Sequence, residues 1–366
     1  DGRVLWERVA REVVPHESHY LDSSWASGSP VTDGTRVIAH FGSFGTYAYD
    51  LDGKLLWSVD LGDMTTRRGF GEGASPALHD DTVVINWDHE GDSFVVALDA
   101  ATGKERWRAA RPDEVTSWAT PLVVRVGDRD QVVIAATGRS RAYDLETGRE
   151  LWSLGGMTVN TFPSPVEVDG VVYLTSGYRG NMLQAVALAG ATGDLEGSPA
   201  VRFSHDRDTP YVPSLLVTGG RIYMIKHFKG ILSVLDATTG AVRYQTRLPE
   251  IDSVWSSPVA AAGRVYVFGR DGTALVLQDG DTFRFYYRGM PEAKHDFDTE
   301  TTCVAESKDG IHWTRPKLEI YEVRGTTDNN VVLARCRGCH NLAPFIDANP
   351  DCPPEQRYKA LGGTGK

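Results

Sequence analysis

The chain has 366 residues, of which 41% are hydrophobic and 10% are aromatic, and its formal net charge is −11. This acidic balance argues against nucleic acid as the main partner, because phosphate binding needs a basic surface. No apolar run approaches the roughly 18 residues of a membrane-spanning helix, so we expect no membrane span.

Residues 1–6 read D-G-R-V-L-W, which is the form of the closing half of a β-hairpin. Complete hairpins of this form follow, with an alternating apolar strand, an Asp, a turn that mostly reads T-G, and a strand that closes on an aromatic residue. Clear copies cover residues 47–57, 95–107, 141–152 and 232–244, and a degenerate copy covers 185–195. The closing aromatic residues are Trp57, Trp107, Trp152 and Tyr244.

A second pattern has the same period, since a small residue followed by proline or serine opens an apolar strand ahead of each hairpin. Each unit therefore holds four antiparallel strands, and a repeat of this length indicates a propeller or a solenoid. The sequence predicts an all-β fold, a β-propeller of four-stranded antiparallel blades with six to eight blades in total. We expect the closing aromatic residues to pack into the neighbouring blade. Six blades are recognisable, over residues 24–57, 73–107, 118–152, 162–203, 211–247 and 254–288.

Residues 1–281 resemble the pyrroloquinoline-quinone-type β-propeller repeat family, through the recurring D-x-x-T-G-x-x-x-W hairpin and the S-P-V opening strand. That family includes quinoprotein dehydrogenases, outer-membrane assembly lipoproteins and extracytoplasmic propellers without a cofactor. The resemblance implies an extracytoplasmic protein, and the absence of cysteine from the first 302 residues fits that location. Pyrroloquinoline quinone with Ca²⁺ is a possible cofactor, but the vicinal cysteine pair frequent in the dehydrogenases is missing, so we expect no cofactor.

The T-G hairpins stop after residue 281, and residues 282–366 resemble the opening of a five-bladed glycoside hydrolase propeller. The motifs that carry this resemblance are F-R-F-Y-Y-R-G, S-K-D-G-I-H-W, F-I-D-A-N-P and R-Y-K-A-L-G-G. It implies a second, incomplete domain and carboxylates around a funnel. His340 and Asp347 flank an apolar strand and are the candidate catalytic residues, although one or two blades do not supply the three acids of such enzymes.

Cys336, Cys339 and His340 form the sequence C-x-x-C-H, which is the attachment pattern of c-type haem. A haem domain needs surrounding helices and usually an axial methionine further along the chain. Here the last methionine is Met290, and the residues after His340 read as strand and turn. We therefore expect no haem, and interpret the cysteines as buried thiols or as partners in a disulfide to Cys352 or Cys303.

The ends of a blade differ, because the T-G turn lies at one end while the middle turn and the link to the next blade lie at the other. The T-G turns are plain, whereas the opposite loops combine charged and aromatic residues, which suits a polar ligand or a peptide. The alternative is that these loops are solvated and their charges pair among themselves. We expect no metal there, because contiguous strand residues such as 88–90 point to opposite faces. The candidate ligand-binding residues are Arg68, Glu72, Asp88, His89, Arg111, Glu114, Trp118, Arg207 and Asp208.

Together these patterns predict a non-catalytic extracytoplasmic scaffold that binds a protein, or a polar small molecule or carbohydrate, on its loop-rich face. The alternatives are a fragment of a glycoside hydrolase fused to a propeller and a quinone-dependent oxidoreductase. The chain opens on Asp1 rather than on Met and shows no signal peptide, so we interpret it as a fragment or a trimmed product.

Overall fold

The structure is a computed structural model that describes residues 2–228, 230–248, 251–278, 283–291, 299–307, 312–339, 342–346, 352–353, 356 and 358–361. The chain folds into two compact units, Asp1–Tyr211 and Val212–Lys366. Regular structure in the described residues is β-strand, apart from three short 3-10 turns, η1 (Gly42–Phe44), η2 (Arg67–Gly69) and η3 (Arg337–Cys339). The predicted all-β fold is therefore confirmed.

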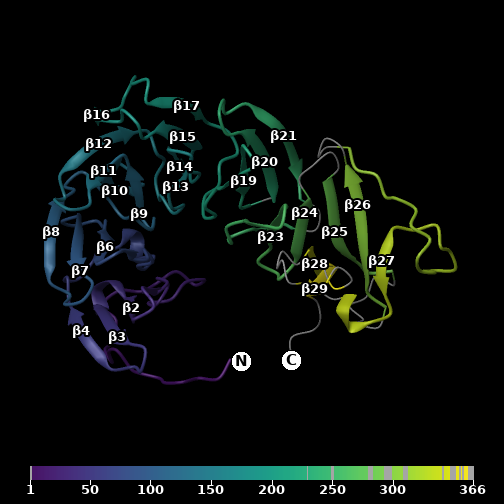
Figure 1. Cartoon of the computed structure of the whole chain (residues 1–366), viewed down its shortest axis with the longest axis horizontal. Helices are drawn as coiled ribbons and strands as arrows, with labels where there is room; N and C mark the ends of the chain where they lie inside the picture. The colour runs from purple at the N-terminus through teal and green to yellow at the C-terminus, as the bar shows by residue number, and fades with distance from the viewer. Residues whose placement is uncertain are drawn as a thin grey trace. The chain divides into compact units, whose positions relative to one another are not determined.

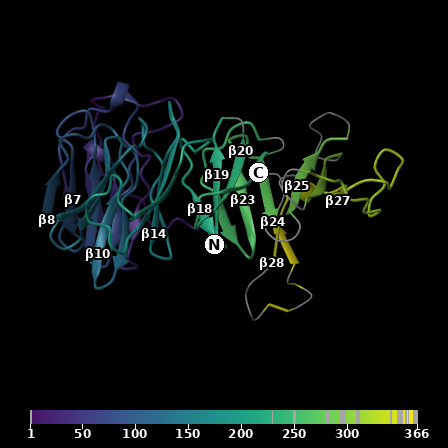
Figure 2. The same cartoon turned by 90° about the horizontal axis from the view of Figure 1, so that it is seen from above.

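Unit 1 contains four sheets that follow one another in chain order and are antiparallel apart from one short parallel pair (Figure 1). Seen from above in Figure 2, its strands run side by side and the loops gather at their two ends. The strands are β1 (Val31–Thr32), β2 (Arg36–His40), β3 (Thr46–Asp50), β4 (Leu55–Val59), β5 (Ala77–His79), β6 (Thr82–Trp87), β7 (Phe94–Asp99), β8 (Glu105–Ala110), β9 (Leu122–Val126), β10 (Arg129–Ile134), β11 (Arg139–Asp144), β12 (Glu150–Gly155), β13 (Val166–Val168), β14 (Val171–Ser176), β15 (Met182–Ala187), β16 (Gly193–Asp194) and β17 (Val201–His205).

Unit 2 contains one sheet of four strands, one of six strands and a two-stranded ribbon. The six-stranded sheet runs in the order β22 to β27, so it extends the sixth predicted blade by two strands. The strands are β18 (Leu216–Thr218), β19 (Arg221–Lys226), β20 (Ile231–Asp236), β21 (Val242–Arg247), β22 (Val259–Ala261), β23 (Arg264–Phe268), β24 (Ala274–Gln278), β25 (Phe283–Gly289), β26 (Thr301–Ser307), β27 (Val331–Ala334), β28 (Ala343–Ile346) and β29 (Tyr358–Leu361).

The predicted domain division at residues 281 and 282 falls inside this six-stranded sheet. β25 lies after the division, and it pairs with β24 before it and with β26 after it. The two sides of the division therefore share one hydrogen-bonded sheet, and the division itself stays a prediction.

The T-G turns are shaped by their aspartate. Asp99 Oδ1 accepts hydrogen bonds from the backbone N–H groups of Ala101 and Thr102 and from the Thr102 hydroxyl. Gly103 then takes a φ of +70°, a left-handed conformation that glycine adopts without strain. Asp236 makes the corresponding bonds in unit 2. The recurring D-x-x-T-G sequence therefore specifies one turn conformation.

Each turn in unit 1 that has this form receives the tryptophan of the preceding sheet. Trp57 Nε1 donates to the Ala100 carbonyl at 2.9 Å, and Trp107 Nε1 donates to the Leu145 carbonyl at 2.7 Å. The Trp107 ring also lies against Gly148, where an added Cβ would come within 2.5 Å of it. The turn glycine is therefore required both for its φ and for its lack of a side chain.

Trp6 makes the same contacts with the first sheet, although residues 2–10 form no strand. Its Nε1 donates to the Leu51 carbonyl at 2.8 Å, and its ring lies against Gly53. Residues 1–6 and 52–57 also share the pattern D-G-[KR]-[LV]-L-W. Trp6 therefore occupies the position that, at the other turns, is filled by the tryptophan on the last strand of the preceding blade.

The degenerate turn at 185–195 receives its tryptophan differently. Trp152 is fully buried in a cluster that includes Leu188 and Leu195, but its Nε1 has no hydrogen-bond partner among the described residues. In place of that bond, β16 pairs in parallel with β12, so that Trp152 faces Gly193. In unit 2, Tyr244 lies in the cluster that joins the two sheets there.

We predict that Gly148→Ala lowers the free energy of unfolding far more than Gly127→Ala. Both glycines have a positive φ, so alanine costs about 1 kcal/mol of backbone strain at either position. Only at Gly148 does the new Cβ also collide with Trp107, which should cost about 2 kcal/mol more. Chemical denaturation of the two variants measures the difference, and equal losses would contradict the docking role of the glycine.

Candidate functional site

The loops at the end of unit 1 opposite the T-G turns include most of the predicted site residues. These loops connect the middle strands of each sheet or link one sheet to the next, and we call them the mouth loops. They comprise residues 41–45, 60–76, 88–93, 111–121, 135–138, 156–165, 177–181 and 206–211.

Arg111 and Asp88 form a buried ion pair beneath these loops. Arg111 Nε donates to Asp88 Oδ1 at 2.7 Å, and Nη2 donates to Oδ2 at 3.0 Å, with both side chains fully buried. Arg111 Nη1 also donates to the Tyr143 hydroxyl at 2.7 Å, and the Ser117 hydroxyl donates to Asp88. Burial disfavours the charged guanidinium, but Asp88 more than offsets this and raises the pKa of Arg111.

Glu114 is a second buried acceptor, and it holds a neighbouring turn. Its two carboxylate oxygens accept from the backbone N–H groups of Gly138 and Arg139, each at 2.9 Å. Arg141 donates to the same carboxylate. The group therefore links the loop before β9 to the turn between β10 and β11, and it has a structural role.

Glu72 is bound in the same manner, at the first sheet. Its carboxylate accepts from the backbone N–H of Ser43 at 2.6 Å and from the Ser43 hydroxyl. Burial raises the pKa of Glu72, against the lowering effect of these two hydrogen bonds.

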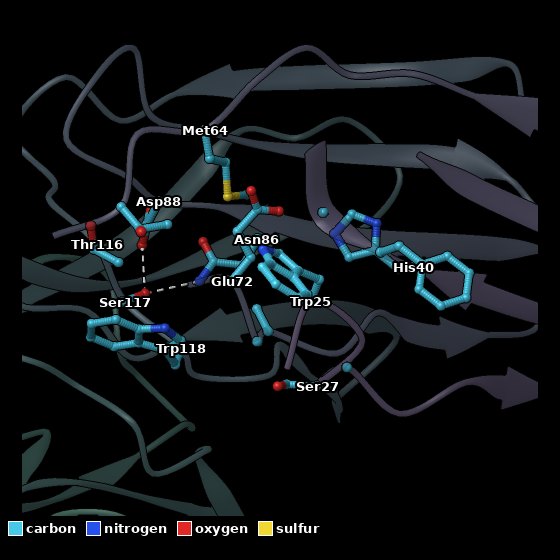
Figure 3. A pocket seen from close by; sticks show the side chains of 16 residues that line it. Trp25, Ser27, His40, Met64, Glu72, Asn86, Asp88, Thr116, Ser117 and Trp118 are labelled. Atoms are coloured by element: carbon cyan, nitrogen blue, oxygen red, sulfur yellow. Dashed lines mark hydrogen bonds between the residues drawn. The ribbon is translucent and has the colours of Figure 1, made fainter. Parts of the chain in front are cut away.

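Glu72 and Asp88 line a small cavity (Figure 3), together with Asn86, Trp118 and other residues. Asn86 Nδ2 donates to the Ser117 hydroxyl at 3.0 Å, while Asn86 Oδ1 is buried without a partner among the described residues. The cavity volume of about 20 Å³ matches one water molecule.

The other predicted residues divide by exposure. His89 and Trp118 are buried: His89 Nδ1 accepts from the backbone N–H of Thr65 at 3.0 Å, and Trp118 Nε1 donates to the Gly71 carbonyl at 2.8 Å. Arg68 and Arg207 are exposed. Asp208 is half-buried in the loop after β17, which is remote in sequence from the cavity residues. The structure thus brings together Glu72, Asp88, Arg111 and Trp118.

A row of aromatic side chains extends over four of the mouth loops, 111–121, 156–165, 177–181 and 206–211. Trp118 stacks on Phe162 with ring centroids 4.2 Å apart and planes 5° apart. Phe162 meets Tyr211 edge-on at 5.1 Å, and Tyr211 stacks on Tyr178 at 4.8 Å. We call Trp118, Phe162, Tyr178 and Tyr211 the aromatic stripe; all but Trp118 are partly exposed.

Cations flank the aromatic stripe. The Arg179 guanidinium lies over the Tyr178 ring, 5.4 Å from its centroid. Arg67 lies close enough to Tyr211 to act on its phenol, although burial dominates and raises the pKa of Tyr211. Phe162 and Tyr211 were not among the residues predicted from the sequence. Each of those two stands beside a proline in a link between blades, which is the signal that would have found them.

An N-terminal arm, residues 15–27, also lies on the mouth loops and was not predicted. Glu17 accepts from the backbone N–H of Thr66 at 2.9 Å and from its hydroxyl at 2.8 Å. The backbone N–H of Tyr20 donates to the Phe70 carbonyl at 3.0 Å. The arm therefore fixes the loop before β5.

The T-G end of unit 1 is less plain than expected. A hollow of about 290 Å³ lies there between the second and third sheets, lined mainly by charged side chains. Some of those charges are paired, as Arg106 is with Asp81 and Arg125 is with Asp130. The hollow is a polar surface with a partly paired charged lining.

Several predicted residues fall outside this picture. His340 and Asp347 lie outside the described residues, so the structure says nothing of the catalytic and haem roles considered for them. Within the described ranges, no group of three His, Cys, Asp or Glu side chains is placed to hold a metal ion. No helix among those residues is long and apolar enough to cross a membrane.

Four-stranded antiparallel sheets that pack in chain order, joined by a tryptophan docked on the next turn, define a β-propeller of quinone-type repeats. Residues 45–283 match the family described as outer membrane protein assembly factor BamB, and the chain belongs to that family.

Individual relatives agree with this assignment. The chain is 30% identical over 195 residues to the serine/threonine-protein kinase AfsK of Streptomyces griseus, which covers 50% of this chain and 22% of the kinase. It is 23% identical over 286 residues to the outer membrane protein assembly factor BamB of Yersinia pestis, covering 74% of this chain and 65% of that protein. The crystal structure of BamB from Moraxella catarrhalis has the same fold, with a TM-score of 0.54, 18% identity and coverage of 71% of this chain and 81% of that one.

The chain spans less than two thirds of the length of either curated relative. These matches confirm the predicted resemblance to the quinone-type repeat family. They give no support to the glycoside hydrolase resemblance of residues 282–366, since the family match ends at residue 283.

We predict that Arg111→Met destabilises the protein by about 3–5 kcal/mol, because it leaves Asp88 buried without a counter-charge. The control is Arg125→Met at the exposed pair with Asp130, which should cost about 1 kcal/mol or less. Urea denaturation at pH 7 measures both. A loss at Arg111 no larger than at Arg125 would show that the buried pair does not brace the mouth loops.

We also predict a pH effect from His40, which is buried beside the cavity with Nδ1 2.8 Å from the Thr46 hydroxyl. Burial lowers its pKa to about 4, whereas the unfolded chain binds the proton near pH 6.5. Its contribution is therefore complete above pH 6.5 and is lost as the pH falls from 6.5 toward 4.

Between pH 7 and pH 5 this loss should be about 2 kcal/mol in the wild type. In His40→Gln that part of the pH dependence should disappear, whatever the variant costs at pH 7. Denaturation at the two pH values measures it, and an unchanged slope in the variant would refute the assignment to His40.

Proposed function

We propose that the protein is a non-catalytic extracytoplasmic scaffold that binds an extended polypeptide segment at the aromatic stripe. The observation that carries this proposal is the row of partly exposed rings of Phe162, Tyr211 and Tyr178, flanked by the Arg179 guanidinium.

The rings are suited to this role because hydrogen bonds to neighbouring groups hold two members of the aromatic stripe in place. Trp118 anchors one end through its bond to Gly71, and Asn160 Nδ2 donates to the Tyr211 hydroxyl at 3.4 Å. Tyrosine and tryptophan offer large contact areas at a low cost in side-chain entropy, and they dominate binding surfaces for that reason. The arginines add partners for carboxylates of the bound segment.

The charged residues of the mouth loops have a structural role, which leaves binding to the aromatic stripe. Asp88, Arg111 and Glu114 are buried and satisfied by one another or by the backbone, so they brace the loops from below. The T-G hollow is larger, but no Phe, Tyr or Trp side chain is among the residues that line it, and some of its charges are already paired. We therefore assign binding to the mouth loops.

The relatives support a protein as the partner. The matching family and the Yersinia pestis relative are both named outer membrane protein assembly factor BamB, and a factor of that kind acts on other proteins. Their compartment and the cysteine-free first 302 residues favour an extracytoplasmic location for this chain. A quinone-dependent oxidoreductase is less favoured, because the vicinal cysteine pair frequent in the quinone-type dehydrogenases is missing from the first 302 residues.

The test is fluorescence anisotropy of a labelled outer-membrane β-barrel polypeptide, diluted unfolded from urea and titrated with the protein. We expect saturable binding that Tyr178→Ala combined with Tyr211→Ala weakens about tenfold or more. Arg125→Ala, at the T-G end, is the matched control and should leave the dissociation constant unchanged.

Circular dichroism confirms that each variant is folded. Absence of binding by the wild type, or equal affinity in the double variant, overturns the proposal. Displacement of the polypeptide by a soluble oligosaccharide would indicate that the aromatic stripe binds a carbohydrate rather than a protein.

A further inference from the structure

Two cysteine side chains of unit 2 meet at the end of β27. Cys336 and Cys339 flank the short turn η3, and the backbone N–H of Cys339 donates to the Cys336 carbonyl at 3.1 Å, which closes the turn. Their Sγ atoms are 3.7 Å apart, so the two thiols are in contact. This geometry is unrelated to the aromatic stripe, which lies in unit 1.

The two thiols differ in exposure. Cys336 is exposed, whereas Cys339 has 1% of its surface accessible. The Cys339 carbonyl accepts a hydrogen bond from the Thr302 hydroxyl at 3.2 Å, so the turn is fixed to β26. Burial raises the pKa of the Cys339 thiol. One sulfur is therefore open to a reactant, and the other is held behind it.

The remaining cysteines are engaged elsewhere. Cys303 lies buried on β26, where its Sγ is 3.5 Å from the Thr301 hydroxyl, and it packs with Val331. Cys352 Sγ is 3.7 Å from the Pro353 carbonyl. Within the described residues no third His, Cys, Asp or Glu side chain joins the pair to form a group that could hold a metal ion.

We propose that Cys336 and Cys339 form a thiol–disulfide exchange pair, which is oxidised by a disulfide-containing substrate and reduced again by thiols. Exposed Cys336 is the attacking thiol, and buried Cys339 is the resolving thiol. A C-x-x-C pair with this asymmetry is a recognised arrangement for such exchange.

The exchange balances in two steps. The Cys336 thiolate attacks one sulfur of the substrate disulfide, which breaks that S–S bond, forms a mixed disulfide and releases the first substrate thiolate, which takes up a proton. Cys339 then loses its proton and attacks the Cys336 sulfur, which forms the internal disulfide and releases the second substrate thiol. The pair gives up two electrons and two protons, and the substrate disulfide gains them.

Oxidised glutathione is the probe for this exchange, used with the full chain under nitrogen, followed by alkylation of the remaining thiols and digestion with trypsin. Trypsin cuts after Arg335, Arg337 and Arg357, so the internal disulfide joins the dipeptide 336–337 to the peptide 338–357. Because Cys352 lies in that second peptide, the mapping is done in parallel on Cys352→Ser. We expect the linked pair in both proteins, and its loss after treatment with reduced glutathione.

Two variants test the order of attack. Cys339→Ser should accumulate one glutathionyl group on Cys336, because the resolving thiol is gone, while Cys336→Ser should react at least tenfold more slowly. Cys303→Ser is the control and should form the internal disulfide as the wild type does. Alkylation of both Cys336 and Cys339 after oxidised glutathione, or a dominant link from Cys336 to Cys303 or Cys352, overturns the proposal.

Discussion

The contact between a tryptophan and the turn glycine of the next sheet is the constraint on which unit 1 depends. Trp57 and Trp107 each donate one hydrogen bond to a turn carbonyl and lie flat on a glycine that has no side chain to hold them off. The contact buries most of a large ring, so it combines a substantial hydrophobic gain with a directional bond. It fixes where each sheet sits on its neighbour, and therefore where the mouth loops of neighbouring sheets come together.

This arrangement leaves the charged and aromatic residues of the mouth loops with different roles. The pairing of Arg111 with Asp88, and of Glu114 with backbone N–H groups, satisfies charges that would otherwise be costly to bury. The rings of Phe162 and Tyr178 remain partly exposed. The binding surface that we propose therefore depends on these rings rather than on the buried charges.

The fold was predictable because its signals are local and repeated. An Asp, a T-G turn and a closing tryptophan specify a hairpin within about a dozen residues, and the repeat itself implies blades. The site was less predictable, because burial decides what a charged loop residue does. In the sequence, nothing distinguishes the loop residues Asp88 and Arg111 from the loop residue Arg68. Only the packing of neighbouring sheets makes the first two buried, whereas Arg68 is exposed.

Other features were missed for similar reasons. Phe162 and Tyr211 are 49 positions apart, so their contact depends on the relation between sheets rather than on a motif. The hold of the N-terminal arm on Thr66 is also a long-range contact that no local pattern encodes. The domain division near residue 282 stays a prediction, and β24 and β25 pair across it.

The most direct test of a binding surface at the aromatic stripe is photocrosslinking from within it. A photoreactive p-benzoylphenylalanine is placed at Phe162, or at exposed Glu146 on the T-G end, and each protein is irradiated with an unfolded outer-membrane β-barrel polypeptide. The account predicts crosslinked product from position 162 and little or none from position 146. Equal yields from both positions, or product from position 146 alone, would contradict it.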